Sequence, residues 1–347
     1  MTPAADALAY GSLTPHVRIK RVEAVINHMA GGVGPGADEA LAEIVQDHGL
    51  KITVSAPAPK DIPAAVAAAL ARKPDLLIIL AGDGTAGVAA GLAGPKGPLL
   101  MPLPGGTMNM LPHALYGRLG WKDALVAGLS LGVERPVSGG RVLGQGAAPD
   151  RPFYCAAILG APALWAEARE AIRAKRPREA FRRAMRALSL AFKGRLRFQL
   201  DGGPKTKCEA LTLMCPLISS AMQGERALEA AALNVHNAIE AFRLGAAALL
   251  PGVDWRNDPT VTSTPVRRAT AWASGRIPAV LDGEPVQLPR RVEVAFTPVA
   301  FRALAPPVEG TAPQKAAAVR TPRAKASAAT AAAKPRRRKP TPAKTKT

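Results

Sequence analysis

The fold is decided by one stretch, Asp75-Leu-Leu-Ile-Ile-Leu-Ala-Gly-Asp-Gly-Thr85. Its apolar first half is typical of a central parallel strand that is covered on both faces. The glycines that follow let backbone N–H groups approach phosphate oxygens, and the next helix presents its positive N-terminus there. An aspartate inside such a loop, Asp83, suits a residue that carries magnesium or accepts a proton. An ordinary Gly/Asp turn is the alternative interpretation of the same residues.

Similar aliphatic runs flank this strand between residues 17 and 131, and each is followed by a turn signal and an Ala-rich stretch. The alternation predicts βα units on an open parallel sheet. The expected strands are 24–27, 51–55, 76–80 and 99–101.

The pattern changes after about residue 132, where strand-like runs follow one another without βα spacing, which favours an antiparallel arrangement. The expected strands there are 133–142, 153–159, 195–200, 210–214, 260–273 and 292–296. The predicted fold class is therefore α/β, with an N-terminal open parallel α/β sheet domain and a C-terminal β-rich antiparallel domain. The predicted boundaries are a lead-in at 1–16, domains at 17–132 and 133–305, and a disordered tail at 306–347.

The net charge of +20 is concentrated at the C-terminal end, because residues 315–347 hold eleven Lys or Arg and no acid. Such a tail suits non-specific nucleic-acid binding or contact with an anionic membrane. The Arg-rich helical stretch 163–193 suits a solvated face or a surface for anionic headgroups. Three cysteines without a CxxC pair argue against a disulfide framework, and no apolar run is long enough to span a bilayer. We therefore predict a soluble, cytoplasmic protein, with peripheral contact at the inner membrane face.

Two further loops at strand ends share the composition of the first. Segment 102–109 puts two glycines and a hydroxyl at a helix start, so that Thr107 suits a phosphate contact and Asn109 suits a helix cap. Segment 27–36 follows the first strand and contains four glycines among ten residues. Each of these two segments, taken by itself, also fits an ordinary turn between a strand and a helix. Because strand ends converge at one crevice of an open α/β sheet, the three loops together predict a ligand site.

A fourth segment, Val280-Leu-Asp-Gly-Glu-Pro285, places Asp282 and Glu284 around one glycine in an otherwise apolar and basic region. A hairpin turn is the simplest interpretation of this segment by itself.

These four elements occur together and in the same order in a known family. The chain resembles the diacylglycerol kinase catalytic-domain family, which includes bacterial lipid kinases and sphingosine kinases. The family pattern is Asn-Pro-x-Ser-Gly, then Gly-Gly-Asp-Gly-Thr, then Pro-x-Gly-Thr-x-Asn, and late in the chain Asp-Gly-Glu. The corresponding segments here are 27–31, 81–85, 104–109 and 282–284.

The resemblance implies a kinase that transfers a phosphoryl group from ATP and Mg²⁺ to the hydroxyl of a lipid alcohol. It implies that Glu284 accepts the hydroxyl proton with help from Asp282, and that Asp83 is catalytic and holds magnesium. The predicted cofactor-binding residues are Asn27, Gly31, Gly32, Gly82, Asp83, Gly84, Thr85, Gly106, Thr107 and Asn109. A homodimer is also compatible with the sequence.

Three alternatives remain at this point. NAD kinases and phosphofructokinases carry a similar Gly-Gly-Asp-Gly loop, so a small-molecule kinase of the same superfamily is the first. A dinucleotide-binding oxidoreductase is the second, although segment 51–60 lacks the acidic residue at its second strand that would hold ribose. The third is a degenerate kinase fold that binds anionic partners through its basic tail.

Overall fold

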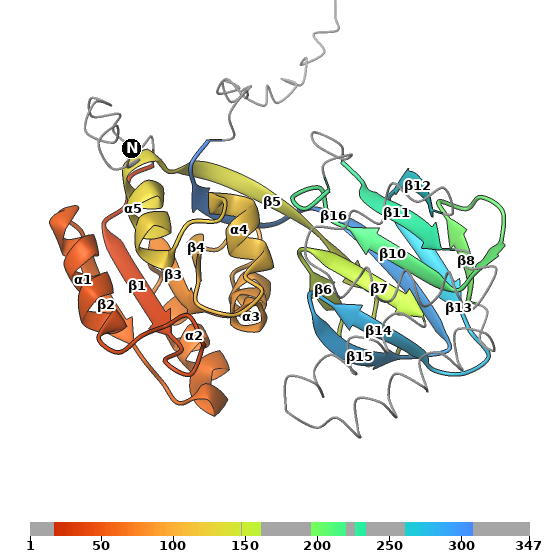
Figure 1. Ribbon diagram of the computed structural model, residues 1–347, viewed down its shortest axis with the longest axis horizontal. Coiled ribbons are helices and arrows are strands. Elements are labelled where there is room, and N and C mark those ends of the chain that lie inside the picture. Colours follow the sequence, from red (N-terminus) through yellow and green to blue (C-terminus); the bar gives the residue numbers. More distant parts are fainter. Residues whose placement is uncertain (1–16, 147, 161–195, 220–225, 234–260, 308–347) are drawn as a thin grey trace, which may run out of the picture. The chain divides into compact units, whose positions relative to one another are not determined.

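The structure is a computed structural model that describes residues 17–146, 148–160, 196–219, 226–233 and 261–307 (Figure 1). The predicted lead-in 1–16, the Arg-rich stretch 163–193 and the tail beyond residue 307 lie outside the described residues. Among the residues that the structure describes, no helix has the length and hydropathy needed to cross a bilayer.

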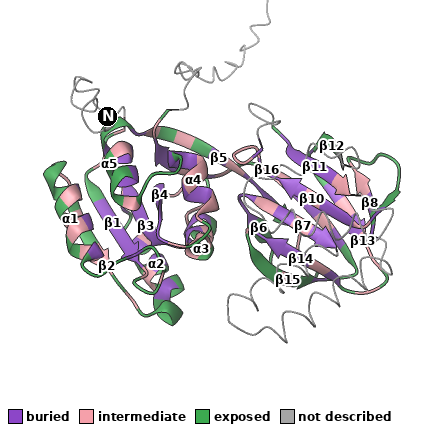
Figure 2. Cartoon of the chain, viewed as in Figure 1, coloured by how far each residue is buried: buried purple, intermediate pink, exposed green. Residues whose placement is uncertain are grey.

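The first sheet begins with four parallel strands in the order β2-β1-β3-β4. Their bounds are β1 (Arg21–Ile26), β2 (Lys51–Ser55), β3 (Leu76–Ala81) and β4 (Leu99–Pro104). Every residue of β3 and β4 is buried, as the purple strands in Figure 2 show, which is the pattern of strands covered on both faces. The predicted parallel sheet is therefore present, with the Gly82 loop at the end of a central strand.

Helices connect these strands and cover them. They are α1 (Ala37–Asp47), α2 (Ile62–Ala71), α3 (Asp83–Ala93), α4 (Met110–Tyr116) and α5 (Trp121–Leu131), with a 3₁₀ turn at Pro59–Asp61 before α2. α2 packs on β1, α3 on β3, and α5 on β4. Small residues make this close packing feasible, since the buried positions of α3 are all alanines, Ala86, Ala89 and Ala90.

Two long strands continue the first sheet beyond its parallel part. β5 (Val133–Val142) pairs antiparallel with β16 (Arg291–Ala305), and β16 joins β4 through the pair Ala303 and Leu100. The end of β16 therefore packs in the core of the N-terminal half, where the Tyr116 hydroxyl donates a 2.7 Å hydrogen bond to the Leu304 carbonyl. Antiparallel strands complete this sheet, namely β6 (Arg151–Phe153), β8 (Leu196–Leu200), β9 (Thr206–Cys208) and β13 (Arg268–Trp272).

The second sheet is antiparallel throughout, with the order β12-β11-β10-β7-β14-β15. Its strands are β7 (Ala156–Gly160), β10 (Ala210–Met214), β11 (Leu228–Leu233), β12 (Val261–Val266), β14 (Ile277–Leu281) and β15 (Glu284–Leu288). Its apolar side chains share one core cluster with β8, β13 and the first part of β16. The predicted fold class, a parallel α/β sheet followed by an antiparallel β-rich part, is confirmed.

Two expected strands are each divided between the two sheets. The run 153–159 becomes β6 in the first sheet and β7 in the second, and the run 260–273 becomes β12 in the second and β13 in the first. An aspartate stands at each break: Asp282 accepts N–H bonds from residues 154–156, and Asp201 accepts them from Arg267 and Arg268. Hydrophobicity alone does not show such breaks.

The last expected strand, 292–296, is much longer in the structure. β16 continues to Ala305 because the pairing with β5 shifts between Thr297 and Phe301, and this bulge accommodates Pro298, which cannot donate to a ladder.

Close packing beside this bulge gives a test of the fold. A Cβ at Gly140 would overlap the ring of Phe153, which is fully buried. Gly140→Ala is therefore expected to destabilise the protein by about 1–3 kcal/mol through overpacking, measured as a lower midpoint of urea unfolding. Gly275→Ala is the control, because a Cβ at that position meets nothing within 4 Å. Equal midpoints for the two variants would contradict this packing.

Candidate active site

The three predicted loops meet through their backbones at the carboxyl ends of β1, β3 and β4. Gly32 N–H donates a 2.8 Å hydrogen bond to the Gly105 carbonyl, and Gly105 N–H donates one of 3.0 Å to the Ala81 carbonyl. A Cβ at Gly106 would lie 2.6 Å from the Cα of Gly82. Because that approach is closer than real Cβ contacts, glycine is needed at 106 for the two loops to touch.

The Gly82 loop delivers the chain directly into α3. Gly82 holds the N-cap position and Asp83 is the first helical residue. The Gly82 carbonyl accepts the N–H groups of Thr85 and Ala86, both at 3.1 Å, which closes the first turn. The remaining N–H groups of a first helical turn have no acceptor within the helix, so this end suits an anion.

Asn109 and Asn27 use their side chains to fix their own loops. The Asn109 side chain exchanges two hydrogen bonds with the backbone of Gly106, at 2.7 and 2.9 Å. It occupies the N-cap position of α4 in a left-handed conformation (φ 49°), but its side chain makes no cap bond to that helix. The Asn27 side chain accepts the N–H of Met29 at 3.0 Å. These two residues shape the predicted nucleotide site.

The remaining predicted cofactor-binding residues belong to these loops and differ in their exposure to solvent. Gly31, Gly32, Gly84 and Thr107 are exposed, whereas Gly82, Thr85 and Gly106 are half-buried. A Cβ at Gly31 would meet nothing within 4 Å, so the space above this glycine is open.

The late acidic segment is the two-residue turn of the hairpin β14–β15. Asp282 and Gly283 both have positive φ, 47° and 91°, and Leu281 pairs with Glu284 across the turn. Asp-Gly is a favoured sequence for such hairpins, because Gly tolerates positive φ freely and Asp tolerates it better than most residues. The hairpin interpretation is therefore correct, and the same turn also brings Glu284 to α3.

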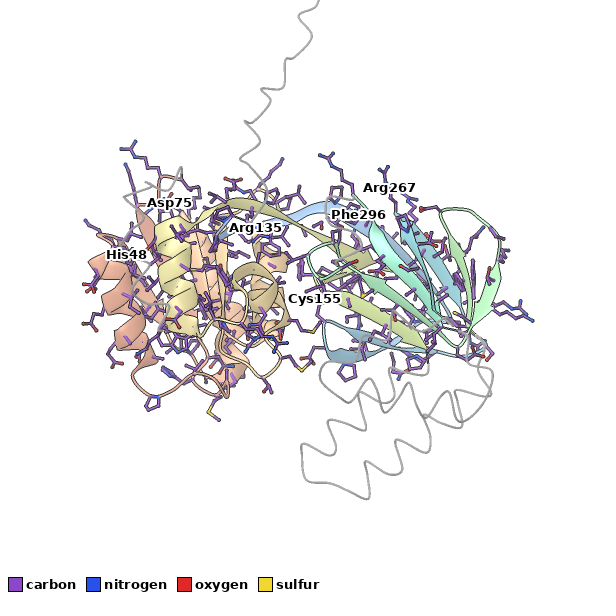
Figure 3. The ribbon with its side chains drawn as sticks, turned by 45° about the horizontal axis from the view of Figure 1, so that its top comes forward. His48, Asp75, Arg135, Cys155, Arg267 and Phe296 are labelled. Carbon is purple, nitrogen blue, oxygen red and sulfur yellow. The ribbon has the colours of Figure 1, made fainter. Side chains whose placement is uncertain are left out.

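The Asp282 carboxylate is held by the backbone between β6 and β7. Its oxygens accept N–H bonds from Tyr154 at 2.6 Å, Cys155 at 2.8 Å and Ala156 at 2.9 Å; Figure 3 labels Cys155. Burial raises the pKa of Asp282, these three donors lower it, and the negative charge of Asp83 raises it again, with a net increase. These three hydrogen bonds attach the hairpin turn to the backbone between β6 and β7, so Asp282 positions the hairpin.

Asp83 and Glu284 line the same cavity, of about 480 Å³. The Asp83 Oδ1 atom accepts the N–H of Leu111 at 3.1 Å, which fixes the carboxylate between α3 and α4. The Glu284 Oε1 atom lies 3.5 Å from the position that a Cβ on Gly84 would take. Residues distant in sequence are thus brought together at the N-terminus of α3. The other lining residues are Gly84, Gly87, Val88, Gly91, Leu92, Pro152, Tyr154, Leu281, Asp282 and Val286.

Sequence reasoning missed the apolar part of this lining. Val88 and Leu92 follow the Gly82 loop at helical spacing, so their position on α3 could have been inferred from the motif. No local signal marks Pro152 or Tyr154, which lie where the chain passes from β6 in the first sheet to β7 in the second.

Among the described residues, no three or more His, Cys, Asp or Glu side chains gather in the manner of a protein-only metal site. Magnesium in kinases is often bound by one or two carboxylates together with phosphate oxygens and water. Asp83, beside a helix N-terminus that suits phosphate, fits that donor set.

Comparison with known proteins agrees with this geometry. Residues 21–142 match the sequence profile of the diacylglycerol kinase catalytic domain, a phosphotransferase domain. A search of curated proteins found no match.

Two crystal structures of proteins from Bacillus anthracis str. Sterne share the fold. One, of a diacylglycerol kinase, has a TM-score of 0.56 and 16% identity, and the match covers 84% of this chain and 98% of that one. The second has a TM-score of 0.57 and 17% identity, with the same coverage. The family match therefore covers residues 21–142, from β1 to the end of β5, and it is to the diacylglycerol kinase catalytic domain.

Proposed function

We propose that this protein transfers the terminal phosphoryl group of ATP to a hydroxyl group of a lipid alcohol, with Mg²⁺ as the metal. The single observation that carries the proposal is the shared cavity of Asp83 and Glu284 at the N-terminus of α3. A catalytic domain profile over residues 21–142 supports the phosphotransferase class.

The loops suit a nucleotide triphosphate because three strand-end backbones meet there with glycines at their contacts. We propose that Gly31, Gly32 and the 82–85 loop bind the phosphates through backbone N–H groups, with Thr107 beside them. When bound, Mg²⁺ would neutralise charge on the transferred group, and Asp83 would hold it.

Glu284 would act on the acceptor. Its carboxylate accepts the proton of the acceptor hydroxyl while that oxygen bonds to the γ-phosphorus and the bond to ADP breaks. Asp282 serves this step by fixing the hairpin that carries Glu284. We accordingly propose that residues 17–132 bind ATP and that residues 133–305 supply Glu284, the group that accepts the proton of the acceptor. A lipid acceptor would bring the protein to a membrane surface, and the roles predicted for the basic tail and for a homodimer remain predictions.

The proposal is tested with the full-length protein, γ-labelled ATP and a panel of acceptors: a diacylglycerol, a sphingoid base and NAD. After chromatography, we expect label on a lipid acceptor and none when EDTA removes Mg²⁺. Label confined to NAD, or on no acceptor, would overturn the proposal.

The positioning role of Asp282 predicts a separate effect on stability and on activity. Asp282→Gly fits the positive φ of the turn but leaves three backbone N–H groups without their carboxylate. We expect a loss of about 1–3 kcal/mol in unfolding free energy and a fall in kcat of up to about 10²-fold from misplacement of Glu284.

Asp201→Gly is the matched control, because Asp201 also has positive φ, precedes a glycine and accepts backbone N–H bonds from Arg267 and Arg268. It should lose similar stability in urea and keep its kcat. If both variants lost activity equally, the claim that Asp282 positions Glu284 would be contradicted.

A further inference from the structure

The cavity beside Glu284 combines acidic and apolar groups. Its charged groups are the carboxylates of Asp83, Asp282 and Glu284, and none of the described residues that line it is Lys, Arg or His. An acceptor with a phosphate or carboxylate near its hydroxyl would meet three carboxylates and no cationic side chain of the lining. Like charges repel most strongly at such short distances, so the lining favours an acceptor without negative charge.

The α3 wall of the cavity carries two large apolar side chains that are left in contact with solvent. Val88 is 39% exposed and Leu92 is 52% exposed. They are one helical turn apart and therefore project on one face of α3. Covering such side chains with an aliphatic group removes apolar surface from water, which is favourable.

Two glycines of α3 let the β6–β7 connection approach the helix closely beside these side chains. A Cβ at Gly87 would lie 3.9 Å from the Tyr154 ring, and one at Gly91 would lie 3.4 Å from the Tyr154 hydroxyl and 3.8 Å from Pro152. Side chains larger than a methyl group at either glycine would therefore enter the space between α3 and the β6–β7 connection.

The wall of the cavity formed by β15 also places an apolar side chain next to a carboxylate. Glu284 and Val286 are two residues apart on β15, so they face the same side of the strand, and both line the cavity. Opposite them, Gly84 lies at the start of α3 near Glu284, and Val88 and Leu92 follow it along the helix. On both walls an apolar surface therefore adjoins the carboxylate that faces the acceptor hydroxyl.

Resting on the proposed function, we propose that Val88, Leu92 and Val286 determine acceptor specificity: the cavity selects an alcohol whose hydroxyl is carried by an aliphatic chain and has no negative charge beside it. The chain lies along Val88 and Leu92 while the hydroxyl lies at Glu284. These three residues touch the acceptor and take no part in the proton transfer.

Chain-length dependence tests the apolar half of this proposal. The probes are 1-monoacylglycerols of increasing acyl length, each below its micelle concentration, with Mg-ATP saturating. Burial of methylene groups predicts that kcat/KM rises by up to about fourfold per methylene. Leu92→Gln is expected to flatten this rise at least threefold over the series. The control is Leu131→Gln on α5, where the leucine is 43% exposed and lies outside the cavity.

Charge selectivity tests the other half. Wild-type kcat/KM should be at least tenfold higher for a 1-monoacylglycerol than for the same molecule bearing a 3-phosphate. Val88→Lys should narrow that ratio at least threefold, whereas Val126→Lys, at a valine 43% exposed on α5, should leave it unchanged.

The outcomes separate the two levels of the account. A wild type that labels acceptors, combined with variants that keep the wild-type chain-length slope and charge ratio, overturns the specificity assignment alone. A wild type that labels no acceptor overturns the proposed function and this inference with it.

Discussion

Glu284→Gln is expected to lower kcat for phosphoryl transfer by about 10²–10⁴-fold, the usual contribution of a positioned general base. The amide has the shape of the carboxylate but cannot accept the hydroxyl proton. Glu284 is exposed at the end of the hairpin turn, and within the described part of the chain it pairs with Leu281 through its backbone, so the fold should be unaffected. Steady-state assays with labelled ATP give kcat, and calorimetric titration with a non-hydrolysable ATP analogue should give an unchanged Kd.

Glu293→Gln provides the control for this substitution. Glu293 is also a partly exposed strand glutamate, but it forms an ion pair with Arg291 at 2.7 Å, outside the cavity. Its replacement should leave kcat within about twofold, because exposed ion pairs contribute little. A Glu284→Gln protein that turned over at the rate of the Glu293→Gln protein would remove Glu284 from the mechanism.

Asp83→Asn is expected to lower kcat/KM by about 10²–10³-fold, the range seen when one preorganised electrostatic contact to a transition state is lost. The amide oxygen can still accept the N–H of Leu111, so the junction of α3 and α4 is retained. The lost charge should raise the Mg²⁺ concentration needed for half-maximal rate. Titration of the rate with Mg²⁺ measures both effects.

Although Asp83→Asn should lower activity, it should not lower the stability of the fold. Asp83 raises the pKa of Asp282 through repulsion between the two carboxylates, so removing its charge relieves an unfavourable interaction. The Tm of Asp83→Asn should therefore equal or exceed that of the wild type. Asp123→Asn, another first-turn aspartate, on α5, is the control and should change neither rate nor Mg²⁺ dependence. A destabilised Asp83→Asn protein with a normal Mg²⁺ requirement would contradict the assignment.

The parallel half of the fold was predictable because its signals are local. The apolar run 76–80 ends in a glycine turn that begins a helix, and the neighbouring βα units repeat the pattern. The structure has these strands at nearly the expected places, although β1 starts at Arg21, three residues before the prediction. Its first position is exposed, so apolar character did not mark the start.

The antiparallel half was less predictable because its boundaries depend on distant partners. Asp201 and Asp282 end strands by accepting N–H groups from residues more than 60 positions away. The strand 228–233 was not foreseen either, and its sequence, Leu-Glu-Ala-Ala-Ala-Leu, has high helix propensity. Pairing with β10 and β12 on both sides determines its conformation instead.

In the candidate site, too, local signals were predictable and contacts that depend on the tertiary fold were not. Loop residues such as Gly82 and Gly106 were identifiable by composition, and the structure brings them into contact. The predicted helix cap at Asn109 instead binds its own loop, and Asp282, expected beside Glu284 in catalysis, is engaged with the β6–β7 backbone. These differences arise because a carboxylate or amide takes whichever backbone groups the tertiary fold presents.

A crystal structure of the protein with a non-hydrolysable ATP analogue and Mg²⁺ tests the central claim most directly. The account predicts the terminal phosphate against the backbone of Gly82 and Gly84, Mg²⁺ bound to Asp83, and the Glu284 carboxylate facing that phosphate across the cavity. A nucleotide bound at another edge of the sheet, or a Glu284 side chain directed away from the terminal phosphate, would contradict it.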